Sequence, residues 1–451
     1  MEIDDVVPAD NKQGKWIVDP FQMKGINGYL YGRGVSDNKG PIMAALYGVM
    51  DLMHEQELES DITFLIEGEE ESGSRGFKDA VRRHKDLIGE IDYIILANSY
   101  WLDDEVPCLT YGLRGMLHAT VKVDSNHPDV HSGVDGSFMM DEPLFDLTAI
   151  LAKLKGLHNR IQIPGFYDAI LPVTPVEDAR YNDITDVLIK RNPELGPPDT
   201  LKASLMARWR EPNLTIHRYK VSGPDGSLVS SQASAAISLR LVPNQEVEDV
   251  ITSLTKFLET SFYTLDTHNH LSITIDNQAD AWLGDPDNEI FQTLEEAIMD
   301  VWGPIGETRR SSVPGPKPKQ APKNSATPPT MSPSVKPTPT TSQTLTNGSD
   351  HTSYAATPLD PSLPEFALDL SSPSDGSNGQ KRRGRKPLYI REGGSIPSIR
   401  FLEKEFNAPA AHLPCGQASD SAHLDNERLR VSNLYKSREI FRKLFKDLPR
   451  K

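Results

Sequence analysis

Four polar clusters in this sequence carry side chains that could perform chemistry, and each follows or lies near an apolar run. The first is a glycine-rich turn at residues 32–40, and the second, residues 67–74, has four carboxylates in five positions. The third, residues 127–133, contains two histidines. The fourth combines a glycine turn at 391–397 with an imidazole among carboxylates at 420–427. Since ligands of an open α/β sheet gather outside the carboxyl ends of its strands, we expect these clusters to converge.

Each cluster also has a simpler interpretation. Asp37, the one carboxylate of the first turn, could cap a helix that begins near Pro41, and the neighbouring glutamates could form a solvated acidic turn. A divalent cation would change that balance, because it makes clustered carboxylates favourable. His131 and His423, each taken alone, could be exposed or hydrogen-bonded histidines without a catalytic or metal-binding role.

Strands and helices that alternate in the first quarter of the chain are the elements that must position the first two clusters. The pattern predicts a strand over residues 28–31, a helix from Pro41 and a buried strand over residues 61–66. A helix over residues 77–84 and a strand over residues 91–97 follow. This alternation predicts an α/β domain with a mostly parallel sheet.

The pattern changes near Arg114. Residues 117–123 and 235–242 alternate apolar and polar side chains, as half-buried strands do, and a helix is predicted over residues 143–157. These features predict a second, α+β domain inserted into the first. The helical pattern of residues 289–302 then returns to the style of the first domain.

Residues 304–386 differ from the rest of the chain, because they are rich in Pro, Ser, Thr and Lys and nearly free of aromatic side chains. Such a segment cannot bury enough apolar surface to offset the entropy of ordering, so we predict disorder. It ends in a basic run at residues 381–386, which could be a nuclear-targeting or DNA-binding patch. The negative charge of the whole chain favours a solvated charge run instead.

The composition limits the class of protein. The chain has 451 residues, 37% of them hydrophobic, which suffices for two or three domains with sizeable cores. A net charge of −16 argues against general binding to nucleic acid or to an anionic membrane. The two cysteines, Cys108 and Cys415, offer no disulfide framework and indicate a reducing compartment. An acidic start and the lack of an apolar run near the ~18 residues of a membrane span lead us to expect a cytoplasmic protein.

Taken together, the motifs resemble those of the co-catalytic zinc metallopeptidase superfamily that contains aminoacylases, carnosine dipeptidases and glutamate carboxypeptidases. The sequence contains, in the same order as in the family, the motifs YGRGVSDNKG, EGEEESGS, YGLRG, HSG, LRLVPN, REGGSIP and SDSAHLDNE. The resemblance covers the chain except residues 304–386. Within the superfamily, the sequence is most similar to the peptidase-like subunits of the fungal glutathione-degradation complex, and next to the cytosolic non-specific dipeptidases.

The resemblance implies an α/β fold, in which a mostly parallel-sheet metallopeptidase domain carries an inserted α+β lid or dimerisation domain and a disordered insert. The expected parts, in chain order, are a first part of the catalytic domain (1–112), the lid domain (113–272), a second part of the catalytic domain (273–303), the disordered Pro/Ser/Thr-rich insert (304–386) and the last part of the catalytic domain (387–451).

The resemblance also implies roles for the residues that match the metal-binding motifs. Asp37 would bridge two ions, Zn²⁺ or Mn²⁺, and Glu71 and His423 would complete the ligands of one of them. Glu70 would be the general base that takes a proton from the attacking water. Asp5 would orient the site.

Other matching residues would act on the substrate. His131 would reach over from the lid domain, commonly from that of a partner subunit, and stabilise the oxyanion. Ser227, Arg240 and Ser395 would hold the substrate's carboxylate, to which the planar fork of an arginine is well suited.

Two positions depart from the family's pattern. Ile3 stands two residues before Asp5, where the family has a histidine ligand, and the strand and helix that precede this position in the family are not in the sequence. Asn98 stands where the dipeptidases have an aspartate ligand, and an amide oxygen is a weaker ligand because it carries no net charge. Both changes affect the same ion, so we expect one tightly bound metal at most. A truncated gene model is the explanation we favour over a poorly folding fragment or a non-catalytic relative.

The functional hypothesis is metal-dependent hydrolysis of an amide bond in a small peptide, in the degradation of glutathione or γ-glutamyl peptides. One alternative is a cytosolic non-specific dipeptidase. The other is a catalytically impaired scaffold subunit that partners a glutamine-amidotransferase-like protein. We expect a small peptide as substrate and a homodimer formed through the lid domain, and neither membrane nor nucleic acid as a partner.

Overall fold

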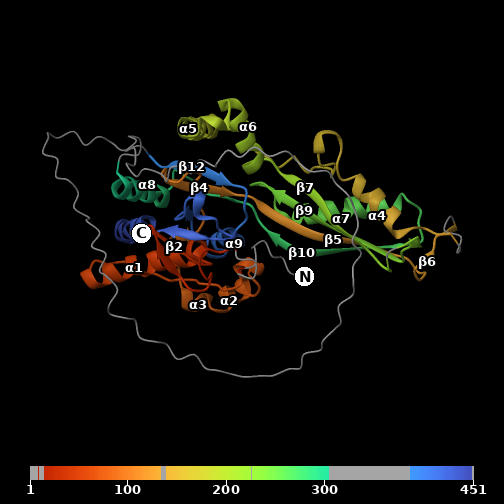
Figure 1. Ribbon diagram of the computed structural model, residues 1–451, viewed down its shortest axis with the longest axis horizontal. Helices are drawn as coiled ribbons and strands as arrows, with labels where there is room; N and C mark the ends of the chain where they lie inside the picture. Colours follow the sequence, from red (N-terminus) through yellow and green to blue (C-terminus); the bar gives the residue numbers. More distant parts are fainter. Residues whose placement is uncertain (1–8, 10–14, 134–138, 225, 304–385, 449–451) are drawn as a thin grey trace, which may run out of the picture. The chain divides into compact units, whose positions relative to one another are not determined.

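Strands from both ends of the chain form the main sheet of the protein, as seen in a computed structural model (Figure 1). The structure describes residues 9, 15–133, 139–224, 226–303 and 386–448. Asp5, Ile3 and nearly all of the predicted disordered insert therefore lie outside the described residues. Of the basic run only Lys386 is described, and its Nζ lies 2.7 Å from Oε1 of Glu295.

The main sheet contains β3 (Ile94–Ala97), β4 (Cys108–Leu113), β11 (Trp282–Leu283), β12 (Leu388–Glu392) and β13 (Ala410–Leu413), in the order β11–β4–β13–β3 with β12 also paired to β4. β12 runs parallel to β4 and β13 parallel to β3, but β11 and β13 are antiparallel to β4. The sheet is therefore mixed: its longer pairings, β12–β4 and β13–β3, are parallel as predicted, and its short pairings, β11–β4 and β13–β4, are antiparallel. The reason for the antiparallel pairing is that the link from β3 to β4 contains no crossover helix, which a parallel return requires.

Helices cover the main sheet and close its core. They are α1 (Gly40–Glu55), α2 (Phe77–Arg83), α3 (Lys85–Ile88), α8 (Glu289–Trp302), α9 (Pro397–Phe406) and α10 (Val431–Asp447). Leu52 of α1, Phe291 of α8 and Phe441 of α10 are buried with the sheet residues of one core cluster. Gly48 lets α1 and α10 approach closely, since a Cβ atom there would lie 3.1 Å from that of Phe441.

A small antiparallel sheet joins the two ends of the chain that carry the first and fourth clusters. It consists of β1 (Lys24–Ile26), β2 (Tyr29–Tyr31) and β14 (Arg428–Arg430), in the order β1–β2–β14. Tyr31 pairs with Arg428. The turn at residues 32–40, which follows β2, is therefore held next to the loop at residues 420–427, which precedes β14.

A second sheet, which we call the lid sheet after the predicted lid domain, is antiparallel. It consists of β5 (Gly115–Asp124), β7 (Asn213–Val221), β9 (Gln232–Leu241) and β10 (His270–Ala279), in the order β10–β5–β9–β7. Helices α4 (Pro143–Ala152) and α7 (Val247–Tyr263) pack on one face, where residues such as Leu117 and Ile237 are buried. Alternate residues of β5 and β9 are only partly buried and form the opposite, polar face. A separate two-stranded sheet pairs β6 (Val130–His131) with β8 (Leu228–Val229).

Two helices lie between strands of the lid sheet in the sequence but pack against the main-sheet region instead. Side chains of α5 (Pro175–Arg191) and α6 (Pro198–Trp209), among them Tyr181 and Trp209, form a core cluster with Trp101, Cys108 and Ile390 of the main-sheet region. The predicted limits of the lid domain stay a prediction.

Most predicted elements agree with the structure, and α8 has the predicted bounds of residues 289–302. The strand predicted at residues 61–66 is wrong, because these residues form no strand and make no backbone hydrogen bond within the described part of the chain. Ile62 and Phe64 still pack against the main core, while 59% of Ile66 is exposed. The apolar run at residues 61–66 thus indicated that part of the segment is packed against the core, but no strand among the described residues pairs with it. No helix of the described part has the length and apolar character of a membrane span.

Candidate metal centre

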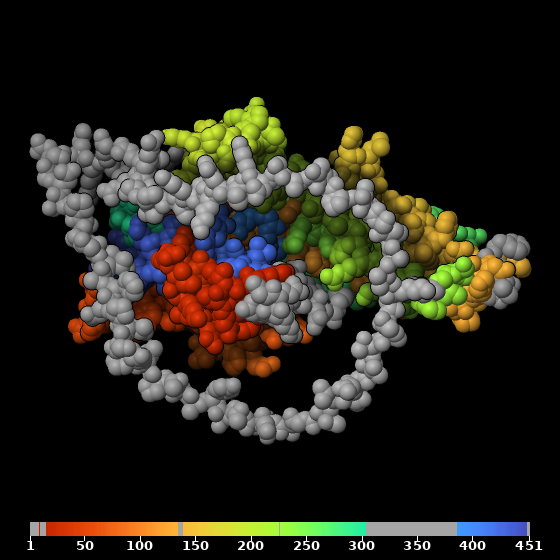
Figure 2. Space-filling view, in the orientation of Figure 1, coloured from red at the N-terminus to blue at the C-terminus, as the bar shows by residue number. Residues whose placement is uncertain are grey.

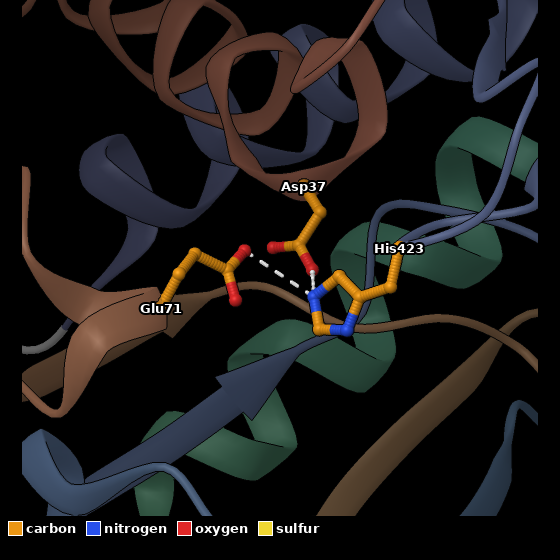
Figure 3. A group of neighbouring side chains, drawn as sticks. All are labelled: Asp37, Glu71 and His423. Carbon is orange, nitrogen blue, oxygen red and sulfur yellow. Dashed lines mark ion pairs between the residues drawn. The ribbon is translucent and has the colours of Figure 1, made fainter. Parts of the chain in front are cut away.

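Three predicted ligands, remote from one another in the sequence, point into a common space (Figure 3). Nε2 of His423 lies 2.8 Å from Oδ2 of Asp37 and 3.2 Å from Oε1 of Glu71. One ligand atom from each residue lies within 4.8 Å of the others. Two carboxylates and an imidazole are a donor set that suits Zn²⁺ or Mn²⁺, so the side chains fit the predicted ion.

Each ligand comes from a short irregular segment rather than from a regular strand or helix. Asp37 lies in the π-helical turn Val35–Lys39 that leads into α1, and Glu71 lies in the short 3₁₀ helix Glu70–Ser72. His423 has a positive φ of 62° in the loop before β14. Loops of this kind can aim side chains from several directions at one point, which a single helix face cannot do.

Glu427 holds the turn that carries Asp37. Its carboxylate is 1% exposed, and its Oε1 accepts hydrogen bonds from the backbone and hydroxyl of Ser36 and from the backbone N–H of Asp37, each at 3.0 Å. Its Oε2 accepts from the backbone N–H of Gly34 at 2.8 Å and from Nη1 of Arg33 at 3.0 Å. Glu427 belongs to the same loop as the imidazole ligand, so it joins the two halves of the site.

Sequence reasoning placed Glu427 only among the carboxylates near His423 and did not find this role. The signal was available in the turn itself. A glycine- and serine-rich turn presents successive backbone N–H groups that need an acceptor when they are buried.

Glu70 lies beside the three ligands. The pKa of its carboxyl is raised to about 7, mainly by burial and then by the neighbouring carboxylates of Glu71, Asp37 and Glu67, against a smaller opposing effect of His423. A carboxyl group with a pKa near neutrality is suited to exchange protons with water, as the prediction of a general base requires.

The imidazole of His423 responds to the same carboxylates. The close carboxylates of Asp37 and then of Glu71 raise the pKa of His423 to about 10, although burial opposes the change. The charged imidazole partly neutralises the two carboxylates. A divalent cation would take over that role and displace the proton, because metal ligation requires the neutral ring.

A further buried carboxylate, close enough to be affected by the charge of Asp37, was also missed. Glu392, in β12, accepts hydrogen bonds from Oγ1 of Thr110 at 2.5 Å and from Oγ of Ser99 at 2.7 Å. Burial raises the pKa of Glu392 to about 7, and the charge of Asp37 contributes. This group belongs to the REGGSIP motif, whose glutamate is the signal that could have identified it.

Asn98 follows β3, and its side-chain oxygen accepts a hydrogen bond from the backbone N–H of Ser99. Its backbone oxygen bonds Nε2 of His412 at 2.9 Å. The adjacent turn is attached to the same strand end, since Nδ2 of Asn38 donates to the carbonyl of Ala97 at 2.6 Å. The amide oxygen of Asn98 is thus engaged by its own backbone, and its role as a degenerate metal ligand stays a prediction.

Two of the predicted substrate-binding residues meet. Arg240 of β9 donates from Nη1 to Oγ of Ser395 at 3.1 Å, which connects the lid sheet to the glycine loop after β12. Arg114 fixes the same loop, with Nε to the carbonyl of Gly393 and its backbone N–H to that of Gly394, both at 3.1 Å.

The third predicted substrate-binding residue, Ser227, lies at another place, beside His131, the residue predicted to stabilise the oxyanion. His131 is an exposed residue of β6 and pairs with Leu228, and the backbone N–H of Ser132 donates to the carbonyl of Ser227 at 3.0 Å. Among the described residues, no hydrogen bond joins Ser227 to Arg240 or Ser395. The roles of His131 and Ser227 stay predictions, and Asp5 lies outside the described residues.

Comparison with known proteins decides the family. A model of peptidase family M20/M25/M40 matches residues 5–316. The chain belongs to this family. The M20 match confirms the resemblance that the motifs indicated, and with it the α/β peptidase fold. Peptidases of this family are metal-dependent, and the cluster of Asp37, Glu71 and His423 is where such an ion fits in this chain.

Curated relatives and solved structures extend the M20 assignment over most of the chain. It is 36% identical over 447 residues to "Probable di- and tripeptidase DUG2" of Saccharomyces cerevisiae, which covers 98% of this chain and 41% of the relative. It is 32% identical over 308 residues to human "Beta-Ala-His dipeptidase", covering 66% of this chain and 60% of the relative. The chain thus spans about half the length of these two proteins.

Two solved structures show the same M20 fold. The crystal structure of human carnosine dipeptidase 1 has a TM-score of 0.63 and 25% identity, and it covers 98% of this chain and 79% of its own. The di-peptidase Dug1p of Saccharomyces cerevisiae has a TM-score of 0.66 and 23% identity, with coverage of 99% and 79%.

Proposed function

We propose that this chain is a metal-dependent hydrolase that cleaves an amide bond of a small peptide, in the degradation of glutathione or γ-glutamyl peptides. The observation that carries the proposal is the convergence of Asp37, Glu71 and His423, with Glu70 beside them. Relatives named as di- and tripeptidases and as Cys-Gly metallodipeptidases support the substrate class. A cytoplasmic location and a homodimer formed through the lid domain are part of the proposal.

The chain's own residues divide the work. A bound cation supplies Lewis-acid polarisation of the scissile carbonyl and of the attacking water. Glu70 accepts a proton from that water and returns it to the leaving amine, for which a pKa between those of ordinary carboxyls and amines is suitable. Arg240 and Ser395, already hydrogen-bonded, receive the substrate's carboxylate and fix its position.

We further propose that one ion binds tightly. Asn98 offers an uncharged oxygen that is already hydrogen-bonded, so a second ion would lack a strong ligand at this position. Titration of the purified chain with Zn²⁺ and with Mn²⁺ measures the number of sites. Two high-affinity equivalents would contradict the one-ion proposal.

The same observation on Asn98 favours a second candidate function. In it, the chain is a scaffold subunit of low activity that partners a glutamine-amidotransferase-like protein. A non-specific dipeptidase is the alternative within the first class. Hydrolysis of a panel that contains Cys-Gly, γ-Glu-Cys and Ala-Gly, with and without added Zn²⁺ or Mn²⁺, separates these possibilities.

The decisive variant is Glu70→Gln, and Glu69→Gln is its matched control. Glu69 is the preceding residue, but it is exposed and pairs with Arg75 on the surface. Hydrolysis that is lost in Glu70→Gln and kept in Glu69→Gln supports the enzyme. Activity that survives Glu70→Gln places the chemistry elsewhere, and a chain that hydrolyses no peptide in the presence of either ion supports the scaffold.

A further inference from the structure

The polar face of the lid sheet is hollowed into a groove of about 450 Å³, a size typical of ligand sites. Its floor consists of the residues of β5 and β9 that point away from α4 and α7, His118 and Ser238 among them. Nothing in the proposed mechanism uses most of this groove.

Positive charge dominates the lining of the groove. Arg114, Arg218, Lys220 and Arg240 line it, and Asp276 is the one carboxylate among its lining residues. That carboxylate already accepts a hydrogen bond at 2.7 Å from a threonine hydroxyl of β5. The groove therefore carries an excess of positive charge in a chain whose net charge is −16.

The four cations of the groove differ from many other arginines and lysines of the protein. Arg191, Arg210 and Arg438 each form an ion pair with a carboxylate. Within the described residues, no carboxylate oxygen lies within ion-pair distance of any of the four groove cations. Their charge is available to a ligand.

The positive charges at one end of the groove are close enough to one another to shift the pKa of an arginine there. The pKa of Arg114 is lowered to about 10, mainly by burial and then by the positive charges of Arg240 and Arg208. Guanidinium groups that repel one another in this way gain most from an anion placed between them.

Strand register gives the length of the groove. Arg240 lies opposite Asn213, and Lys220 lies opposite Ser234, six residues away along β9. At about 3.3 Å per residue, the two ends are roughly 20 Å apart. His217 lies between them, and its Nε2 is 2.8 Å from Oγ of Ser238. Positive charge is thus present at both ends, with a polar middle.

We propose that this groove is a subsite for a second anionic group on the part of the substrate that follows the scissile bond. The inference rests on the proposed function, because Arg240 and Ser395 would hold the first carboxylate at one end. One carboxylate cannot neutralise the remaining charge of Arg114, Arg218 and Lys220. The enzyme then prefers peptides that carry an acidic side chain on this side in addition to the terminal carboxylate.

Matched peptides place the second anion at two distances from the scissile bond. Ala-Glu and Ala-Gln differ only in the side-chain charge of a dipeptide, and Ala-Gly-Glu and Ala-Gly-Gln differ only in that of a tripeptide. For the metal-loaded full chain, we expect kcat/KM to favour the charged member of at least one pair by about tenfold at low salt, as two partly exposed charge contacts would give. The preference should shrink as ionic strength rises.

The double variant Arg218→Met, Lys220→Met tests the groove itself, because both side chains are exposed and remote from the metal ligands in sequence. We expect the charged-to-neutral ratio to fall toward one. Lys256→Met is the matched control, since Lys256 is an exposed cation of α7 on the opposite face of the lid sheet, and its ratio should stay at the wild-type value.

A ratio within twofold of one for both peptide pairs in the wild type overturns the inference and leaves the proposed function intact. If no peptide is hydrolysed, the proposed function fails, and the groove is tested by calorimetric titration of the metal-free chain with glutarate. Binding that the double variant weakens about tenfold supports the anion subsite. Equal binding by wild type and double variant, or none by either, overturns it.

Discussion

Replacing Glu427 by glutamine tests whether the metal centre depends on the turn that supports it. The carboxylate receives five hydrogen bonds, three at Oε1 and two at Oε2. Glutamine has the same shape but only one acceptor oxygen. If that oxygen keeps the three bonds of Ser36 and Asp37, the new NH₂ group faces the N–H donors of Gly34 and Arg33.

The cost follows from the donors that lose their acceptor. Each buried donor left without a partner costs about 1–3 kcal/mol, and hydrogen bonds to a charged group are the stronger kind. Removing one partner of a buried ion pair adds to this, because the side chains of Arg33 and Glu427 are only 15% and 1% exposed. We expect Glu427→Gln to lower the free energy of unfolding by about 3 kcal/mol. Since the same turn presents Asp37, Zn²⁺ affinity should fall about tenfold or more, as for other residues that orient metal ligands.

Urea unfolding of the metal-free chain and Zn²⁺ competition with a chromogenic chelator measure the two effects separately. Glu57→Gln is the control, because Glu57 forms an exposed ion pair with Lys446 at the end of α1. It should change neither the unfolding midpoint appreciably nor the Zn²⁺ affinity. Wild-type Zn²⁺ affinity in a folded Glu427→Gln protein would refute the argument that this carboxylate positions Asp37.

Three more outcomes follow from the structure. As the proposed base, Glu70 must be ionised to act, and its pKa is raised to about 7. We therefore expect kcat/KM to fall as pH drops through this value, or through a lower one when a cation is bound; a pH profile flat from 5 to 8 would contradict this. The pKa of His423 is raised to about 10, so binding of Zn²⁺ at pH 8 should release a proton from the imidazole. Calorimetry in buffers of different ionisation enthalpy should then give a binding enthalpy that depends on the buffer. An enthalpy independent of the buffer would argue against ligation by this ring. Glu177→Ala should lower the free energy of unfolding by about 3 kcal/mol, because Arg391 and Arg210, whose side chains are 9% and 11% exposed, lose the carboxylate that they share. A change in the urea midpoint no larger than that of a surface variant would contradict the estimate.

Sequence alone assigned three candidate metal ligands that the structure brings together, because each lies in a motif whose residue types and order are informative. Asp37, Glu71 and His423 were assigned from such motifs, and their side chains meet. The helix over residues 289–302 was also predicted with the observed bounds, since its apolar period and its Asn288 cap are local signals.

Features that depend on pairing between remote segments were not predictable in the same way. The apolar run at residues 61–66 indicated burial correctly for Ile62 and Phe64, but whether a run becomes a strand depends on a neighbour that its own sequence does not specify. The direction of β4 relative to β13 and the packing of α5 against the main-sheet region are likewise tertiary choices. The support that Glu427 gives to a turn nearly four hundred residues away belongs to this class too.

This support explains why the two most distant motifs of the chain act as one unit. β14 pairs with β2, and directly beyond that pairing the loop of His423 meets the turn of Asp37. Carboxylates and an imidazole at such short range would not hold their places by mutual attraction alone, because Glu70 and Glu71 repel Asp37. The backbone N–H groups bound by Glu427 fix Asp37 independently of any cation. An ion at the proposed site would then bind to ligands that are already positioned, and its free energy of binding would not be spent on ordering the turn.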